Sequence, residues 1–194
     1  MVIYTHDLAF LYELDRAATE LQVPLRPHTV DRTCEGTGVP VITGVYPETL
    51  PVKKLVKHIR AEAEKAAALD GLDPERRGRV VGCYSLIRSG YERVVEEVLL
   101  QSVVRPFDKA VHTEKLKGVE VKDLDHQKVF LAIKKCSDII EAHRTPAGSG
   151  TTRLPSNDGL MADVQALEAF RKAAEERAAA ATDRRKRLEH PPTA

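Results

Sequence analysis

Apolar and polar positions near the start of the chain change period within a few residues. Val2 to Tyr4 form a short apolar, β-prone run, and a polar corner, Thr5-His6-Asp7, separates it from a segment with helical spacing. A strand, a corner and a helix in this order are the unit from which parallel sheets are built, and such strands are covered on both faces. The pattern therefore predicts a strand whose neighbours lie elsewhere. The helical positions are Leu8, Leu11, Leu14 and Ala17.

The next segment predicts extended structure with interruptions. Val23 to Leu25 and Thr29-Val30 favour short extended segments, and the sequence CEGTGVPVITGVYP favours a loop that contains at most an edge strand. This glycine-rich stretch lacks a G-K-[ST] ending and does not run from a strand straight into a helix, so we do not interpret it as a phosphate-binding loop. The first 45 or so residues thus predict a small α/β piece.

From about residue 50 the apolar spacing becomes helical throughout. A first helix is expected to begin at Pro51 and end at Asp70-Gly71, followed by a charged loop, LDPERRGR. A second helix, YSLIRSGYERVVEEVLLQSVV, is expected to end before Pro106. Their apolar stripes are Val52, Leu55, Val56, Ile59, Ala63 and Ala66, and then Ile87, Tyr91, Val94, Val95, Val98 and Leu99.

Two more helices are predicted, one from about residue 125 to 143 and one that begins near Ser156-Asn157, which are good N-cap residues. The second half of the last helix has almost no apolar stripe, so we expect it to project or fray. The stripes of these two helices are Val129, Ile133, Cys136 and Ile140, and then Met161, Val164, Leu167 and Phe170.

Composition limits the class of protein. The 194 residues carry 30 basic and 29 acidic side chains, so no global basic field drives non-specific nucleic-acid binding. Cys34, Cys83 and Cys136 are far apart and odd in number, which favours a reducing compartment over a disulfide framework or a cysteine zinc site. No apolar run reaches membrane-spanning length and no signal peptide is evident. We therefore expect a cytoplasmic, soluble protein with no membrane partner.

The first candidate site residue is His6. It follows the predicted strand directly, where open α/β sheets place the groups that handle ligands. The simpler alternative, which the spacing alone favours, is a helix start capped by Thr5 or Asp7.

The second candidate site begins with Arg88, Glu92 and Glu96, spaced four residues apart on one predicted helix. The commonest use of this spacing is an exposed salt-bridge ladder. His143 follows the apolar register of the third helix, so we expect its side chain to point inward. A bundle that brought His143 beside Arg88 and Glu92 would assemble a metal-free set for phosphoryl transfer: an acid or base, a charge stabiliser and an orienting carboxylate. Both interpretations stay open on spacing alone.

Several of these segments together resemble a known family. VIYTHDLAFLYEL resembles the strand and switch-histidine segment near the C-terminal end of the ATPase head in ABC-type AAA ATPases, closest to the RloC-like and PrrC-like ATPases of bacterial phage defence. YSLIRSGYERVVEEVLL, VVRPF and KKCSDIIEAH resemble the helical region that follows that head. In that family this region is an anticodon nuclease module of the HEPN type. The resemblance covers most of residues 1–145.

The resemblance implies a mainly α-helical chain that begins with a fragment of an α/β ABC-type ATPase head and continues into a HEPN-like helical bundle. The domains it implies are residues 1–45, the C-terminal segment of the head; 46–147, the helical module; 148–157, a flexible linker; and 158–194, a charged helix and tail.

The family's nuclease triad is an arginine, a glutamate four residues later and a downstream histidine. The matching positions are Arg88, Glu92 and His143, with His126 and His112 as competitors for the third role. The three side chains would have to converge within direct or one-water reach. The chain carries this Arg-Glu variant rather than the usual arginine followed closely by a histidine, and no metal ligands are implied.

A glycine within the core motif bears on that geometry. Gly90 follows Arg88 by two residues, and glycine weakens a helix interior. The glycine therefore bears on how Arg88 is positioned, and the assignment of the region does not depend on it.

The phosphate-loop, signature and acidic strand-end motifs of such an ATPase are absent from the sequence. The resemblance therefore implies the C-terminal part of an ATPase-coupled RNA endonuclease that cannot hydrolyse ATP alone. ATP and Mg²⁺ would bind only in a complete assembly, where His6 would contact the γ-phosphate or the attacking water. The implied partners are RNA, typically tRNA, and a missing N-terminal head or split partner chain, in a homo- or hetero-oligomer. Met1 would then be an internal start, a frameshift product or the start of the second half of a split system.

Two alternatives remain open. One is a non-catalytic helical interaction or regulatory domain of an ATPase, in which Arg88 and Glu92 only form a salt bridge. The other is a truncated, inactive fragment.

Overall fold

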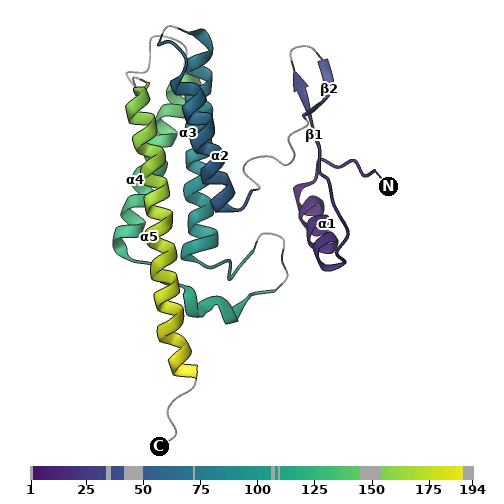
Figure 1. Ribbon diagram of the computed structural model, residues 1–194, viewed down its shortest axis with the longest axis vertical. Helices are drawn as coiled ribbons and strands as arrows, with labels where there is room; N and C mark the ends of the chain where they lie inside the picture. The colour runs from purple at the N-terminus through teal and green to yellow at the C-terminus, as the bar shows by residue number, and fades with distance from the viewer. Residues whose placement is uncertain are drawn as a thin grey trace, which may run out of the picture.

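A computed structural model describes residues 2–33, 36–41, 50–71, 73–105, 108, 110–144 and 154–189 (Figure 1). The chain is mainly α-helical, as predicted. Its elements are α1 (Leu8–Glu20), β1 (Thr29–Thr33), β2 (Gly36–Val41), α2 (Val52–Ala67), α3 (Pro74–Val94), the π-helical turn η2 (Val95–Leu99), the 3₁₀ helix η3 (Thr113–Gly118), α4 (Asp123–Arg144) and α5 (Asn157–Glu189).

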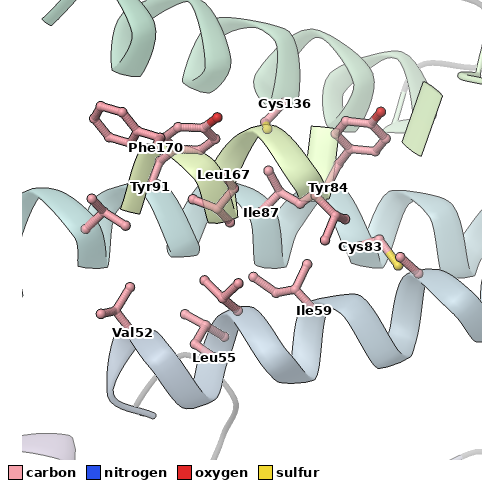
Figure 2. Close-up of a cluster of buried hydrophobic side chains, with 14 of the residues drawn as sticks. Val52, Leu55, Ile59, Cys83, Tyr84, Ile87, Tyr91, Cys136, Leu167 and Phe170 are labelled. Atoms are coloured by element: carbon pink, nitrogen blue, oxygen red, sulfur yellow. The ribbon is translucent and has the colours of Figure 1, made fainter. Parts of the chain in front are cut away.

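The core lies between α2, α3, α4 and α5, whose apolar stripes face one another (Figure 2). All six predicted stripe positions of α2 are buried, which confirms that helix. The side chains with the least exposure come from all four helices: Leu55 and Ile59 of α2, Tyr84 and Ile87 of α3, Cys136 of α4, and Leu160 and Leu167 of α5.

The helix α3 is longer at its start than predicted. Residues 74–79 belong to the charged stretch that the sequence analysis assigned to a loop, but they are helical. Asp73 is the N-cap, and its side chain accepts a hydrogen bond from the Glu75 amide at 2.8 Å. Pro74 stands in the first turn, where its fixed φ favours the helix and its missing N–H costs nothing. The capping chemistry therefore outweighs the charged composition.

The same helix ends earlier than predicted. It passes into η2 and stops at Leu100, and Gln101 and Ser102 have positive φ angles of 53° and 50°. Pro106, the expected stop, lies outside the described residues. The carboxylate of Glu97 on η2 accepts a hydrogen bond from the Val52 amide at 2.9 Å, so the π-helical turn satisfies a donor at the start of α2.

The second half of α5 neither frays nor lacks a buried face, contrary to the prediction. The helix is continuous over 33 residues, and Ala174, Ala178 and Ala181 are buried along one side of it. Arg177 contacts Asp125 at 2.6 Å, and Arg185 donates hydrogen bonds to backbone carbonyls of η3 and Val119. Alanines contribute little to an apolar pattern in the sequence. Their small side chains nevertheless allow close packing, and the contacts of the arginines hold the helix in place.

The N-terminal segment differs most from the prediction. Val2, Ile3 and Tyr4 form no strand and are 77%, 42% and 87% exposed. The strands β1 and β2 pair with each other as an antiparallel hairpin, which confirms extended structure near Thr29 and an edge strand in the glycine-rich stretch. No portion of an α/β ATPase head is seen in the described part of the chain. Strand pairing depends on residues distant in sequence, which local alternation does not report.

Candidate functional site

Arg88 and Glu92 form an ion pair on the exposed side of α3. Arg88 Nε lies 3.1 Å from Glu92 Oε1, and their side chains are 46% and 51% exposed. Arg88 Nη1 also lies 3.4 Å from the hydroxyl of Ser137 on α4. Glu96 does not extend this pair, because its carboxylate contacts Arg93 Nη1 at 3.0 Å. The site is thus a guanidinium, a carboxylate and a hydroxyl that span two adjacent helices.

The third member of the predicted catalytic triad is His143. His143 lies in the last turn of α4, but its side chain is outside the described residues, so its convergence with Arg88 and Glu92 stays a prediction. The position of His143 along α4 determines how far its side chain would have to reach. His143 is six residues beyond Ser137, which is about 9 Å along a helix. Because α4 runs antiparallel to α3, this displacement points away from Glu92.

The two competing histidines lie elsewhere. His112 precedes η3, with Nε2 at 2.9 Å from Asp108 Oδ2 and Nδ1 at 3.5 Å from Glu114 Oε1. His126 is exposed in the first turns of α4 and stacks on Phe130, with ring centroids 6.2 Å apart. Neither histidine has a recorded contact with Arg88 or Glu92.

The corner that contains His6 is built as a helix start. The Asp7 side chain accepts a hydrogen bond from the Phe10 amide at 3.3 Å, and Thr5 Oγ1 accepts one from the Asp7 amide at 3.0 Å. His6 itself is exposed. These contacts match the capping alternative, and the role of His6 toward a nucleotide stays a prediction.

The described cysteines are not poised as nucleophiles. Burial raises the pKa of Cys83 to about 11 and that of Cys136 to about 12, with nearby Glu62 and Asp163 adding to the two effects respectively. The thiolate is the reactive form, so both side chains act as small apolar residues of the core. Cys34 lies outside the described residues.

An apolar groove, which sequence reasoning missed, lies between η2 and α4 and opens to the surface of the bundle. It encloses about 480 Å³, and its walls include Val95, Leu99, Val121, Val129, Phe130 and Ile133. His126 and Lys134 also line it. The signal in the sequence was Phe130, an apolar residue of α4 outside the stripe that faces the core, which is 58% exposed.

Comparisons of the chain with known protein families, with characterised proteins and with solved structures find no match. The arrangement of its helices defines the chain as a mainly α-helical bundle protein. Within the described ranges, no helix is long and apolar enough to cross a membrane. Among those same residues, histidine, cysteine and acidic side chains form no group of three that would suit a metal ion.

Proposed function

We propose that this chain is a non-catalytic helical interaction module of an ABC-type ATPase assembly. The observation that carries the proposal is the groove between η2 and α4. Leu100, Val121 and Phe130 at this groove are 46%, 53% and 58% exposed. Contiguous exposed apolar surface of this kind is typical of protein-binding sites. The link to an ATPase rests on the resemblance of the N-terminal and α3 sequences alone.

The N-terminal segment supports the same proposal. Apolar side chains between residues 2 and 30 are widely exposed, for example Leu21 at 74% and Val23 at 57%. None of the side chains described in this segment is buried. This segment has no core of its own, so covering its apolar surface with another chain would be energetically favourable.

In this function Arg88 and Glu92 are structural. Their charges neutralise each other, and the additional contact to Ser137 ties α3 to α4 beside the groove. Such exposed pairs contribute little to stability, and they help to fix the relative position of two helices.

Co-purification from native cells tests the proposal. The tagged chain should recover a protein that carries a phosphate-loop motif, and Phe130→Asp, at the groove, should abolish its recovery. Leu188→Asp is the matched control, because Leu188 is an exposed leucine of α5 at 75% exposure that does not line the groove. Recovery that Phe130→Asp leaves unchanged, or recovery of no such protein, would contradict the proposal.

A second candidate function is a metal-independent ribonuclease of the HEPN type that cuts tRNA or another RNA in phage defence. Arg88, Glu92 and the Ser137 hydroxyl support it, because they lie together at an accessible seam where a phosphate could bind. His143 would supply the acid or base. ATP and Mg²⁺ would bind only in a complete assembly, through His6 and a partner head.

Cleavage of tRNA in EDTA tests the second candidate. Arg88→Ala, Glu92→Ala and His143→Ala should each abolish cleavage, with His126→Ala and His112→Ala separating the competitors for the third role. Arg16→Ala is the matched control, because Arg16 also pairs with a glutamate four residues later but lies on α1. Absence of cleavage, or cleavage that persists in the three variants, favours the interaction module.

A further inference from the structure

We propose that the groove between η2 and α4 receives the helix α1 of a second copy of this chain. This inference rests on the proposed interaction function and names its partner. Three properties of the two surfaces carry it: their length, their apolar side chains and their charge.

The lengths are compatible. The α4 residues that line the groove run from Asp125 to Lys134, which is about 14 Å at the rise of an α-helix. The helix α1 has 13 residues, which is about 20 Å. A single helix of this length spans the groove from end to end and extends about one turn beyond it.

The apolar surfaces also match. The groove has an apolar wall on each side, from η2 and from α4, with Phe130 exposed at its edge. On α1, Phe10 is 44% exposed, and Leu11 and Leu14 are only partly buried. A helix of 13 residues is marginal in water without tertiary packing, so α1 would gain stability from an apolar groove.

The charges are opposite. The sequence of α1 contains Glu13, Asp15 and Glu20 against Arg16, a net charge of −2. At the groove, Asp125 is neutralised by Arg177, which leaves Lys134 as the charged residue of the lining without an ion pair in the described part of the chain. The carboxylate of Asp15 likewise has no recorded partner among described residues.

A second copy supplies the helix because α1 of the same chain is placed elsewhere. Figure 1 shows α1 and the hairpin beyond α2, on the opposite side of the bundle from α4. None of the α1 residues whose side chains the structure describes lines the groove. If each copy inserts its α1 into the groove of the other, the two contacts are equivalent and the assembly closes as a two-fold dimer.

Sedimentation of the full chain tests this arrangement. The wild type should be a dimer, and Phe130→Asp in the groove and Phe10→Asp on α1 should each raise the dissociation constant at least tenfold. Leu188→Asp should leave it unchanged. Both phenylalanines are exposed, so circular dichroism should show an unaltered helical fold. A monomeric wild type, or a dimer that resists both substitutions, would overturn the proposal.

Mixing the two variants makes the test specific. The Phe130→Asp chain keeps an intact α1, and the Phe10→Asp chain keeps an intact groove. At a concentration at which each variant alone is monomeric, their mixture should form a heterodimer through one restored contact. A mixture without heterodimer would refute reciprocal exchange of α1.

Charge reversal identifies the register. Lys134→Asp should weaken the dimer, and Asp15→Lys on the same chain should restore it, because each contact then pairs a lysine with an aspartate again, with the two charges exchanged between groove and helix. If the double variant is no tighter than Lys134→Asp alone, α1 does not lie in the groove in this register and the charge argument fails.

Together with the co-purification experiment, these outcomes distinguish a failure of the dimer proposal from a failure of the proposed function. A monomeric wild type whose co-purification with a phosphate-loop protein still depends on Phe130 would refute the second copy and retain the interaction module. A dimer that depends on Phe130 and Phe10, without any such protein, would refute the ATPase link alone.

Discussion

The bundle and the N-terminal segment have similar apolar patterns but opposite burial. In α2, Leu55 and Ile59 are completely buried, whereas Leu21 and Val23, just after α1, are 74% and 57% exposed. Both regions form helices where apolar residues recur at helical spacing. An apolar face in the sequence therefore predicts a helix or a strand, but burial of that face requires a second apolar surface that packs against it. The bundle supplies that face within the chain, and the N-terminal segment does not.

The largest expected effect comes from truncating a core leucine. Leu55→Ala should lower the free energy of unfolding by about 2–5 kcal/mol, because it removes buried methyl groups and leaves a cavity. Leu21→Ala, the matched change in the N-terminal segment, should alter it by no more than about 0.5 kcal/mol. Urea unfolding followed by circular dichroism measures both. Equal losses would show that the N-terminal segment has a core of its own.

The next largest loss of stability is expected from removing the arginine that pairs with a buried carboxylate. Asp125 is 3% exposed, and its side chain accepts hydrogen bonds from Arg177 and from the Lys122 amide. Arg177→Met would leave the buried carboxylate of Asp125 without its cation. The substitution should lower the free energy of unfolding by roughly 3 kcal/mol, the lower part of the usual range, because Arg177 is itself partly exposed. Arg187→Met, an exposed arginine on the same helix, is the control. A loss no larger than that of the control would mean that the lower half of α5 contributes nothing to the bundle.

A pair of glycines on α3 should give effects of opposite sign. A Cβ on Gly90 would lie 2.6 Å from Leu167 Cδ2, whereas one on Gly82 would meet nothing within 4 Å. Overpacking costs about 1–3 kcal/mol, and alanine is favoured over glycine by about 1 kcal/mol in a helix. Gly90→Ala should therefore destabilise the protein by up to about 2 kcal/mol, and Gly82→Ala should stabilise it by up to about 1 kcal/mol. Thermal melts measure both, and stabilisation by both substitutions would show that α3 and α5 are not in close contact at Gly90.

The elements were predictable where local pattern decides them. The α2 stripe and the extent of α4 follow from spacing, whereas the pairing of Val2 to Tyr4 depends on distant residues and its prediction was wrong. The π-helical turn η2 was not predictable either, because its place is coupled to a tertiary hydrogen bond between Glu97 and Val52.

The site was predictable to a similar degree. The four-residue spacing of Arg88 and Glu92 gives their ion pair, because that spacing fixes them within one helix. The contact of Arg88 with Ser137 depends on how two helices pack, and no spacing within α3 reports it. Gly90 was interpreted as a weak point of the helix, yet it lies where Leu167 of α5 packs closely against α3. The groove needed the structure, because a residue outside the core-facing stripe, such as Phe130, does not reveal that η2 forms the opposite wall.

The smallest expected effect decides what Arg88 and Glu92 are for. Both side chains are about half exposed, so a double-mutant cycle with Arg88→Ala and Glu92→Ala should give a coupling free energy of about 0.2–1 kcal/mol. The pair on α1, Arg16 with Glu20, is the matched cycle in the N-terminal segment and should couple no more strongly, because its atoms are 3.9 Å apart. A coupling above about 2 kcal/mol would exceed what exposed pairs supply and would show that the contact with Ser137 makes the site rigid. A small coupling together with unchanged groove binding would leave the pair free for another role, and the tRNA assay would then decide whether that role is catalysis.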